Sequence, residues 1–174
     1  MGGNLLIIEA DTLFRKNLAW RLESERFHIA SADHETNVKK IIKKGKIDVA
    51  LLSLNNFKRE GLGILKSIKK IRPIVEVITI NNPDQIELSI EGMRLGAFDD
   101  FILPFEMDSF IRRIKDACSY KKKREKTKKS IFERCQDIFA AASFAEADEA
   151  GMALDFLKER KKSKRQINLK KQSD

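Results

Sequence analysis

Short apolar runs recur along the first two thirds of the chain and predict the strands of a sheet. They occupy residues 5–8, 49–52, 75–80 and 101–102, with a weaker run at 28–31. Each run is short enough for a strand, and apolar positions follow one another without strict alternation. Continuous apolar runs of this kind are typical of strands buried on both faces of a parallel sheet.

Segments in which apolar residues follow a helical spacing separate these runs. Asp11 is placed to cap the first helix, and Pro73 stops the third. The stretch from Asp84 to Glu87 resembles a capping box that opens the fourth helix, and Gly96 marks its end. The predicted helices cover residues 13–25, 38–44, 62–71, 84–96 and 110–117.

The alternation of strands and helices predicts the fold class. Strand–helix units that repeat within about 120 residues favour an α/β fold with an open, doubly wound parallel sheet of five strands and helices on both faces. In such sheets the working site lies at the carboxyl ends of the strands. The residues that directly follow the strands are therefore the candidates for chemistry.

Three segments at these positions resemble the receiver domains of bacterial response regulators. Residues 5–11 resemble the first strand and its acidic turn, and residues 48–53 resemble the third strand, which ends at the phospho-acceptor. Residues 92–105 resemble the segment around the fifth strand. The resemblance covers residues 4–120 and implies the flavodoxin-like receiver fold.

The same resemblance implies that the phospho-acceptor pocket is degenerate. An active receiver has two adjacent acids after the first strand that help to hold Mg²⁺, and this chain has Glu9 and Ala10 there. The aspartate that attacks the phosphoryl donor after the third strand is replaced by Ser53. The Thr or Ser after the fourth strand is replaced by Asn81. The pocket has therefore lost its acceptor residue.

The segment of the fifth strand departs from the receiver pattern as well. An active receiver has a Lys before the proline that follows this strand, and here Leu103 precedes Pro104. Asp100 stands three positions before Leu103, where receivers usually carry an aromatic switch residue. By resemblance we expect a cis peptide bond before Pro104.

These replacements argue against phosphotransfer. Forming an acyl phosphate needs a carboxylate nucleophile, a divalent cation and a cation such as Lys to stabilise the product. A serine hydroxyl is a poor nucleophile without a neighbouring base, and one glutamate is a weak Mg²⁺ site. We therefore expect no enzymatic activity, no cofactor and lost or weak Mg²⁺ binding. Glu9 and Asp11 are interpreted first as capping and loop acids.

The charge of the chain is concentrated at its C-terminal end. Residues 1–120 carry 19 Lys and Arg against 17 Asp and Glu, a net of +2, whereas residues 121–174 carry 16 against 9, a net of +7. The two cysteines, Cys118 and Cys135, form no metal-ligand spacing and no disulfide framework. Without a predicted signal peptide or membrane span, we expect a cytoplasmic protein.

The pattern after residue 120 predicts three further segments. Residues 121–129 form a basic connector that continues the fifth helix, and residues 130–162 form a helical extension. Residues 163–174 are polar and basic and are predicted to be disordered. Ile131, Cys135, Ile138 and Ala142 place an apolar stripe on the extension, which we expect to be buried on the receiver-like domain, a second copy or a partner.

The sequence therefore favours a pseudo-receiver in bacterial signal transduction that acts by binding a protein partner, with homodimerisation possible and no role for a membrane. Two alternatives stay open. One is a nucleic-acid-binding regulator that uses the basic C-terminal region, where Ala147 and Gly151 have the spacing of a helix-turn-helix. That spacing is common by chance, which disfavours nucleic acid as a partner without excluding it. The other is a phosphorelay receiver with atypical chemistry.

Overall fold

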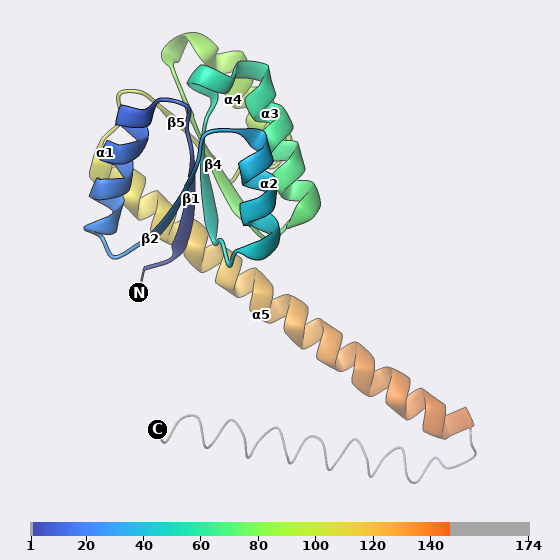
Figure 1. Cartoon of the computed structure of the whole chain (residues 1–174). Coiled ribbons are helices and arrows are strands. Elements are labelled where there is room, and N and C mark those ends of the chain that lie inside the picture. The colour runs from blue at the N-terminus through green and yellow to red at the C-terminus, as the bar shows by residue number, and fades with distance from the viewer. Residues whose placement is uncertain (1, 147–174) are drawn as a thin grey trace. The chain divides into compact units, whose positions relative to one another are not determined.

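A five-stranded parallel sheet forms the centre of the first part of the chain (Figure 1). The computed structural model describes residues 2–146. The strand order is β2-β1-β3-β4-β5, and every neighbouring pair is parallel. The strands are β1 (Asn4–Ile8), β2 (His28–Ala32), β3 (Val49–Ser53), β4 (Glu76–Asn81) and β5 (Asp99–Ile102). The predicted α/β fold class is confirmed.

Helices cover both faces of this sheet, as Figure 1 shows with α1 and α5 on one side and α2 and α3 on the other. Side chains alternate along β1, so that Leu6 and Ile8 join one core while Leu5 and Ile7 join the other. The helices are α1 (Thr12–Glu23), α2 (Glu35–Lys44), α3 (Leu54–Ile71), α4 (Ile86–Arg94) and α5 (Met107–Glu146).

Two helix starts differ from the sequence prediction. Helix α3 begins at Leu54, eight residues before the predicted start at 62, and contains a break at Lys58 with φ 46° and ψ −126°. The predicted capping box at Asp84 is not formed, because Pro83–Gln85 makes a 3₁₀ turn before α4 begins at Ile86. By contrast, Asp11 caps α1 as predicted, and its side chain accepts hydrogen bonds from the main-chain N–H groups of Leu13 and Phe14.

The chain divides into two compact units, residues 1–124 and residues 125–174. Lys121, which the sequence placed at the start of a basic connector, is buried within the first unit and donates to Asp48 Oδ1 at 2.7 Å. In the second unit, α5 continues to Glu146 and leaves Ile131 and Ile138 exposed. The predicted extension beyond 146 and the tail at 163–174 lie outside the described residues.

No helix within the described residues is long and apolar enough to cross a membrane.

Candidate functional site

Three polar side chains are buried together where the central strands end. Glu9 follows β1, Ser53 ends β3 and Asn81 ends β4, with exposed fractions of 2%, 1% and 0%. Strands β1, β3 and β4 are neighbours in the sheet, so parallel topology brings these three positions to one edge. The structure thus places the predicted pocket residues Glu9, Ser53 and Asn81 side by side at the carboxyl edge.

Glu9 holds the loop that follows β1. Its Oε1 atom accepts hydrogen bonds from the main-chain N–H of Asp11 at 2.8 Å and from Nδ2 of Asn56 at 2.6 Å. Arg15 donates to the main-chain carbonyls of Glu9 and Ala10 rather than to the carboxylate. Asp11 acts as a helix cap, as interpreted from the sequence, whereas Glu9 organises the loop.

Ser53 and its neighbours leave polar atoms without partners. Among residues 2–146, the buried atoms Ser53 Oγ, Asn55 Oδ1, Asn81 Oδ1 and Gln85 Oε1 make no hydrogen bond. Buried polar groups in folded proteins are almost always paired, so orphan atoms of this kind require an explanation. Their position at the ends of β3 and β4 puts all four at or beside the predicted pocket.

Asp100 is the centre of a hydrogen-bond network that sequence reasoning did not foresee. Its carboxylate accepts from Thr79 Oγ1 at 2.6 Å, from Ser89 Oγ at 2.5 Å and from Asn81 Nδ2. Asn81 Nδ2 also donates to Ser89 Oγ at 3.0 Å. Strand β4, helix α4 and strand β5 are therefore tied to one carboxylate at the position of the expected switch residue.

The sequence pattern could have indicated only part of this network. Thr79 and Asn81 stand two positions apart in β4 and so lie on one face of the strand, which a strand pattern can indicate. Ser89 comes from a helix, and only the packing of α4 on the sheet brings it within reach of Asp100.

Leu103 and Pro104 complete the edge. The peptide bond between them is cis, as the resemblance predicted. Leu103 is half-buried and packs against the core that also contains Phe110, and its main-chain N–H donates to Asn81 O at 2.8 Å. An apolar side chain thus occupies the position where a receiver carries a lysine.

A groove of about 630 Å³ lies between the segments that follow β3 and β4. One wall is formed by residues 57–60, which lead on from Ser53, and the other by residues 83–88, which lead on from Asn81. Both walls carry charges and apolar groups, and Phe57 and Ile86 are among the latter. The groove therefore continues the pocket edge outward between α3 and α4.

Comparison with known proteins decides the family. The model of the response regulator receiver domain matches residues 5–115 of this chain. The chain belongs to this family. Receiver domains are signalling domains that do not themselves act as enzymes as a rule.

Several curated regulators are similar to this receiver. A putative response regulator NtrX-like of Rickettsia typhi is 33% identical over 125 residues, which are 70% of this chain and 26% of that protein. The DNA-binding transcriptional regulator NtrC of Proteus hauseri is 24% identical over 142 residues, 80% of this chain and 30% of that protein. This chain thus spans about a quarter of the length of the curated relatives it matches.

Solved structures show the same relationship. The receiver domain of NtrX from Brucella abortus has a TM-score of 0.62 and 25% identity, and the match covers 66% of this chain and 98% of that one. A CheY-like receiver domain protein from Methanospirillum hungatei has a TM-score of 0.65 at 21% identity, which shows the fold.

The family implies a Mg²⁺ ion at the carboxyl edge, but the residues of this receiver do not fit one. Mg²⁺ requires near-octahedral oxygen ligands and usually takes one or two carboxylates. Ala10 and Ser53 supply no carboxylate, which leaves Glu9 as the one acid at these family positions. Within residues 2–146, His, Cys, Asp and Glu side chains form no group of three that could hold a metal.

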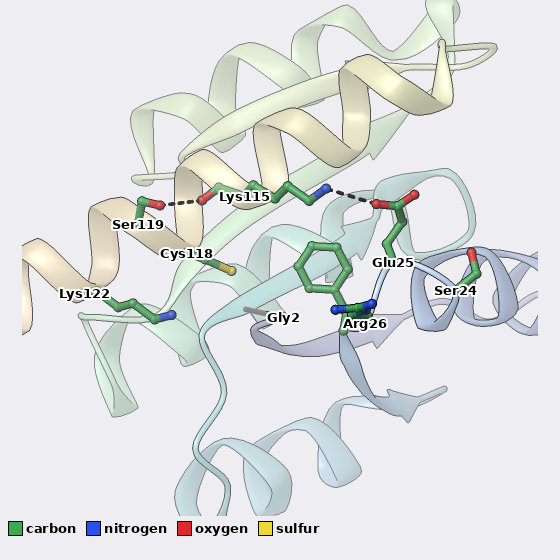
Figure 2. A pocket seen from close by; sticks show the side chains of 9 residues that line it. Gly2, Ser24, Glu25, Arg26, Lys115, Cys118, Ser119 and Lys122 are labelled. Carbon is green, nitrogen blue, oxygen red and sulfur yellow. Dashed lines mark hydrogen bonds and ion pairs between the residues drawn. The ribbon is translucent and has the colours of Figure 1, made fainter. Parts of the chain in front are cut away.

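The opposite edge of this receiver carries a second cavity of about 480 Å³, shown in Figure 2. Lys115 donates to Glu25 across it at 3.0 Å, and Cys118 lies on α5 at its floor. Burial, followed by the nearby charge of Asp48, raises the pKa of the Cys118 thiol to about 11. A thiol with this pKa stays protonated at neutral pH, so the cavity is not a reactive-cysteine site.

A buried ion pair lies near this cavity. Lys121 and the main-chain N–H of Asn4 both donate to the Asp48 carboxylate, at 2.7 and 2.8 Å. Burial by itself raises the pKa of Asp48, but the hydrogen bonds from Lys121 and Asn4 and the charges of Lys121 and Lys122 outweigh it, so that the pKa is lowered. The pair attaches the start of β3 to α5, which gives it a structural role.

Proposed function

We propose that this chain is a receiver that takes up no phosphoryl group and signals by binding a protein partner. The observation that carries the proposal is Ser53, which is buried at the end of β3, where the family pattern has the phospho-acceptor aspartate. Phosphorylation of a serine hydroxyl needs a neighbouring base that removes its proton. Ser53 Oγ contacts no such base among the described residues.

The surroundings of Ser53 support the same proposal. A phosphoryl group brings negative charge that must be neutralised by a metal ion or a cationic side chain. Ala10 removes one metal-ligating carboxylate, and Leu103 replaces the lysine with an apolar side chain. The one buried acid left, Glu9, would repel the incoming phosphoryl group.

The network around Asp100 supports signalling that does not depend on phosphate. In a switching receiver the residue at this position changes place when phosphate arrives. Here the carboxylate accepts from Thr79, Ser89 and Asn81, and hydrogen bonds to charged groups contribute about 1.5–3 kcal/mol each. The α4–β5 surface is therefore held in one arrangement, which is the one we propose a partner recognises.

Two other functions receive less support. Nucleic-acid binding would use the basic region after residue 120, and its helix-turn-helix spacing at 147–151 lies outside the described residues. The relative named as DNA-binding matches this chain over only 30% of its own length. Phosphorelay with atypical chemistry would need an alternative nucleophile, and the carboxylates of Glu9 and Asp100 are both engaged by hydrogen-bond donors.

Intact mass spectrometry tests the proposal. The full chain is incubated with acetyl phosphate and Mg²⁺, beside the variant A10D/S53D/L103K as a matched positive control. We expect an unchanged mass for the natural chain, and a hydroxylamine-sensitive phosphoryl adduct on the variant. An adduct on the natural chain would disprove the proposal, whether or not the variant folds.

A further inference from the structure

The buried orphan atoms described above share one chemical property. Asn55 Oδ1, Asn81 Oδ1 and Gln85 Oε1 are amide oxygens, which can only accept hydrogen bonds, and Ser53 Oγ can accept as well. A buried acceptor without a donor carries the full cost of its desolvation. A group that donates several hydrogen bonds would satisfy these acceptors at the carboxyl edge of β3 and β4.

The hydrogen bonds of Asn81 fix the direction of its oxygen. Nδ2 donates to Asp100 and to Ser89, which lie on the side of β5 and α4. A flipped amide would place its oxygen against the Asp100 carboxylate, so the assignment is set by chemistry. Asn81 Oδ1 is thus the amide atom that is left without a partner, on a strand that is the neighbour of β3 in the sheet.

The negative charge of Glu9 also favours a ligand that carries a positive charge. Glu9 is buried, and within residues 2–146 its carboxylate has no cationic side chain at ion-pair distance. Its two donors, Asp11 N–H and Asn56 Nδ2, are neutral, and Arg15 bonds main-chain carbonyls instead. Buried charges are normally paired with an opposite charge or bound to a metal ion.

Solvent lies next to the buried Glu9. Its sequence neighbour Ala10 and its hydrogen-bond donor Asn56 are both exposed. The groove between residues 57–60 and 83–88 opens beside the same edge, and Gln85 lines it. Gln85 therefore belongs both to the orphan acceptors and to the lining of this groove.

We infer that this site binds a cation that carries N–H donors, an ammonium or guanidinium group, in place of the phosphoryl group and Mg²⁺. The inference rests on the proposed function, because a phosphoryl group and a cation have opposite charges and would compete for the same pocket. An N–H cation supplies a charge for Glu9 and donors for Ser53 and Asn81 in a single group. A guanidinium presents five N–H donors in a planar fork, and an ammonium presents three.

Probe titrations of the full chain test this inference. Methylguanidinium and ethylammonium are added while the side-chain amide signals of Asn55 and Asn81 are followed by NMR. Tetramethylammonium, which has the charge and no N–H donor, is the matched control probe. We expect saturable shifts with the first two probes and none with the third.

Two variants locate the site. Glu9→Gln removes the charge and is expected to weaken binding by about tenfold or more, as for loss of a charge-assisted hydrogen bond. Ser53→Ala removes one orphan acceptor and is expected to weaken it less. Glu23→Gln, an exposed acid at the end of α1, is expected to leave binding unchanged. If Glu9→Gln fails to fold, the probe affinity of Ser53→Ala is compared with that of the natural chain instead.

The outcomes separate this inference from the proposed function. If neither the two N–H cations nor acetyl phosphate shifts the amide signals, the inference is overturned and the proposed function stands. Equal shifts with tetramethylammonium also overturn it, because they show a general charge effect. A saturable response to acetyl phosphate overturns the proposed function. A tripeptide Gly-Arg-Gly that binds more tightly than methylguanidinium assigns the group to a protein side chain, and the reverse assigns it to a small molecule.

Discussion

At the scale of single residues, Asp100 shows how one replacement changes a switch position. An aromatic ring cannot accept hydrogen bonds from Thr79, Ser89 and Asn81 as a carboxylate does, and the Asp100 carboxylate accepts from all three. If the carboxylate moved away, these donors would be left without an acceptor, which costs free energy. Asp100 therefore stabilises one arrangement of β4, α4 and β5.

Replacing Asp100 by alanine should destabilise the protein. We expect a loss of about 1.5–3 kcal/mol in the free energy of unfolding, because buried donors lose a charged acceptor. Urea unfolding measures it. Asp108→Ala, which removes an exposed acid of α5, is the control and should cost less than about 1 kcal/mol. A loss for Asp100→Ala no larger than the control's would contradict a stabilising network.

The two thiols should differ sharply in reactivity. Cys118 is buried and its pKa is raised to about 11, so its thiolate is scarce at pH 8, whereas Cys135 is exposed. We expect one thiol to react rapidly with a disulfide reagent in the native protein and the second only after unfolding. The variant Cys135→Ser should abolish the fast phase. A fast phase that persists in this variant would show that Cys118 is accessible.

At the scale of elements, the apolar pattern predicted the sheet well because buried strands need continuous apolar runs. It located β1 to β5 and the edge where they end. It placed the start of α3 too late, because residues 55–60 contain a single apolar residue, Phe57, and show no helical spacing. The Asp100 network was missed because its members lie on three elements, and periodicity along one element carries no information about their contact.

The Asp48–Lys121 pair shows how α5 is held on the sheet. Replacing Asp48 by asparagine should destabilise the fold by about 1.5–3 kcal/mol, because the buried Lys121 loses a charged hydrogen-bond acceptor. The double variant D48L/K121M should be less destabilised than either D48L or K121M alone. Thermal and urea unfolding of the four proteins give the coupling energy. Additive losses would show that the pair does not interact.

The pH dependence of this pair has a definite sign. The pKa of Asp48 is lowered in the folded protein from its usual 3.8, so the unfolded chain binds the proton more tightly. The stability contributed by the pair is present above pH 3.8 and is lost as the pH falls through the lower, folded pKa. Unfolding measured from pH 6 downward should therefore show a loss below pH 4 that is smaller in the variant D48N.

At the scale of the whole chain, the first unit should fold without the second. Lys121 and Arg124 pair with Asp48 and Glu76, both inside the first unit. A fragment of residues 1–124 should keep these pairs, whereas a fragment of residues 1–120 leaves Asp48 buried without Lys121 and should lose about 3–5 kcal/mol. Thermal melts of the two fragments compare them. Equal melting temperatures would place the boundary before Lys121.

Apolar side chains are exposed on the described part of the second unit. Ile131, Phe132 and Ile138 are exposed on α5, and burying each such side chain contributes about 1.5–3 kcal/mol. Contact with a protein partner would bury these side chains.

The most direct test of the whole account is the amide spectrum of the full chain before and after addition of beryllofluoride and Mg²⁺, which together mimic a phosphorylated receiver. The account predicts that the signals of Ser53, Asn81, Asp100 and α4 stay in place, because the chain lacks the acceptor and Asp100 holds the surface. Saturable shifts that spread from Ser53 into α4 and β5 would show a working phosphate switch and would contradict it.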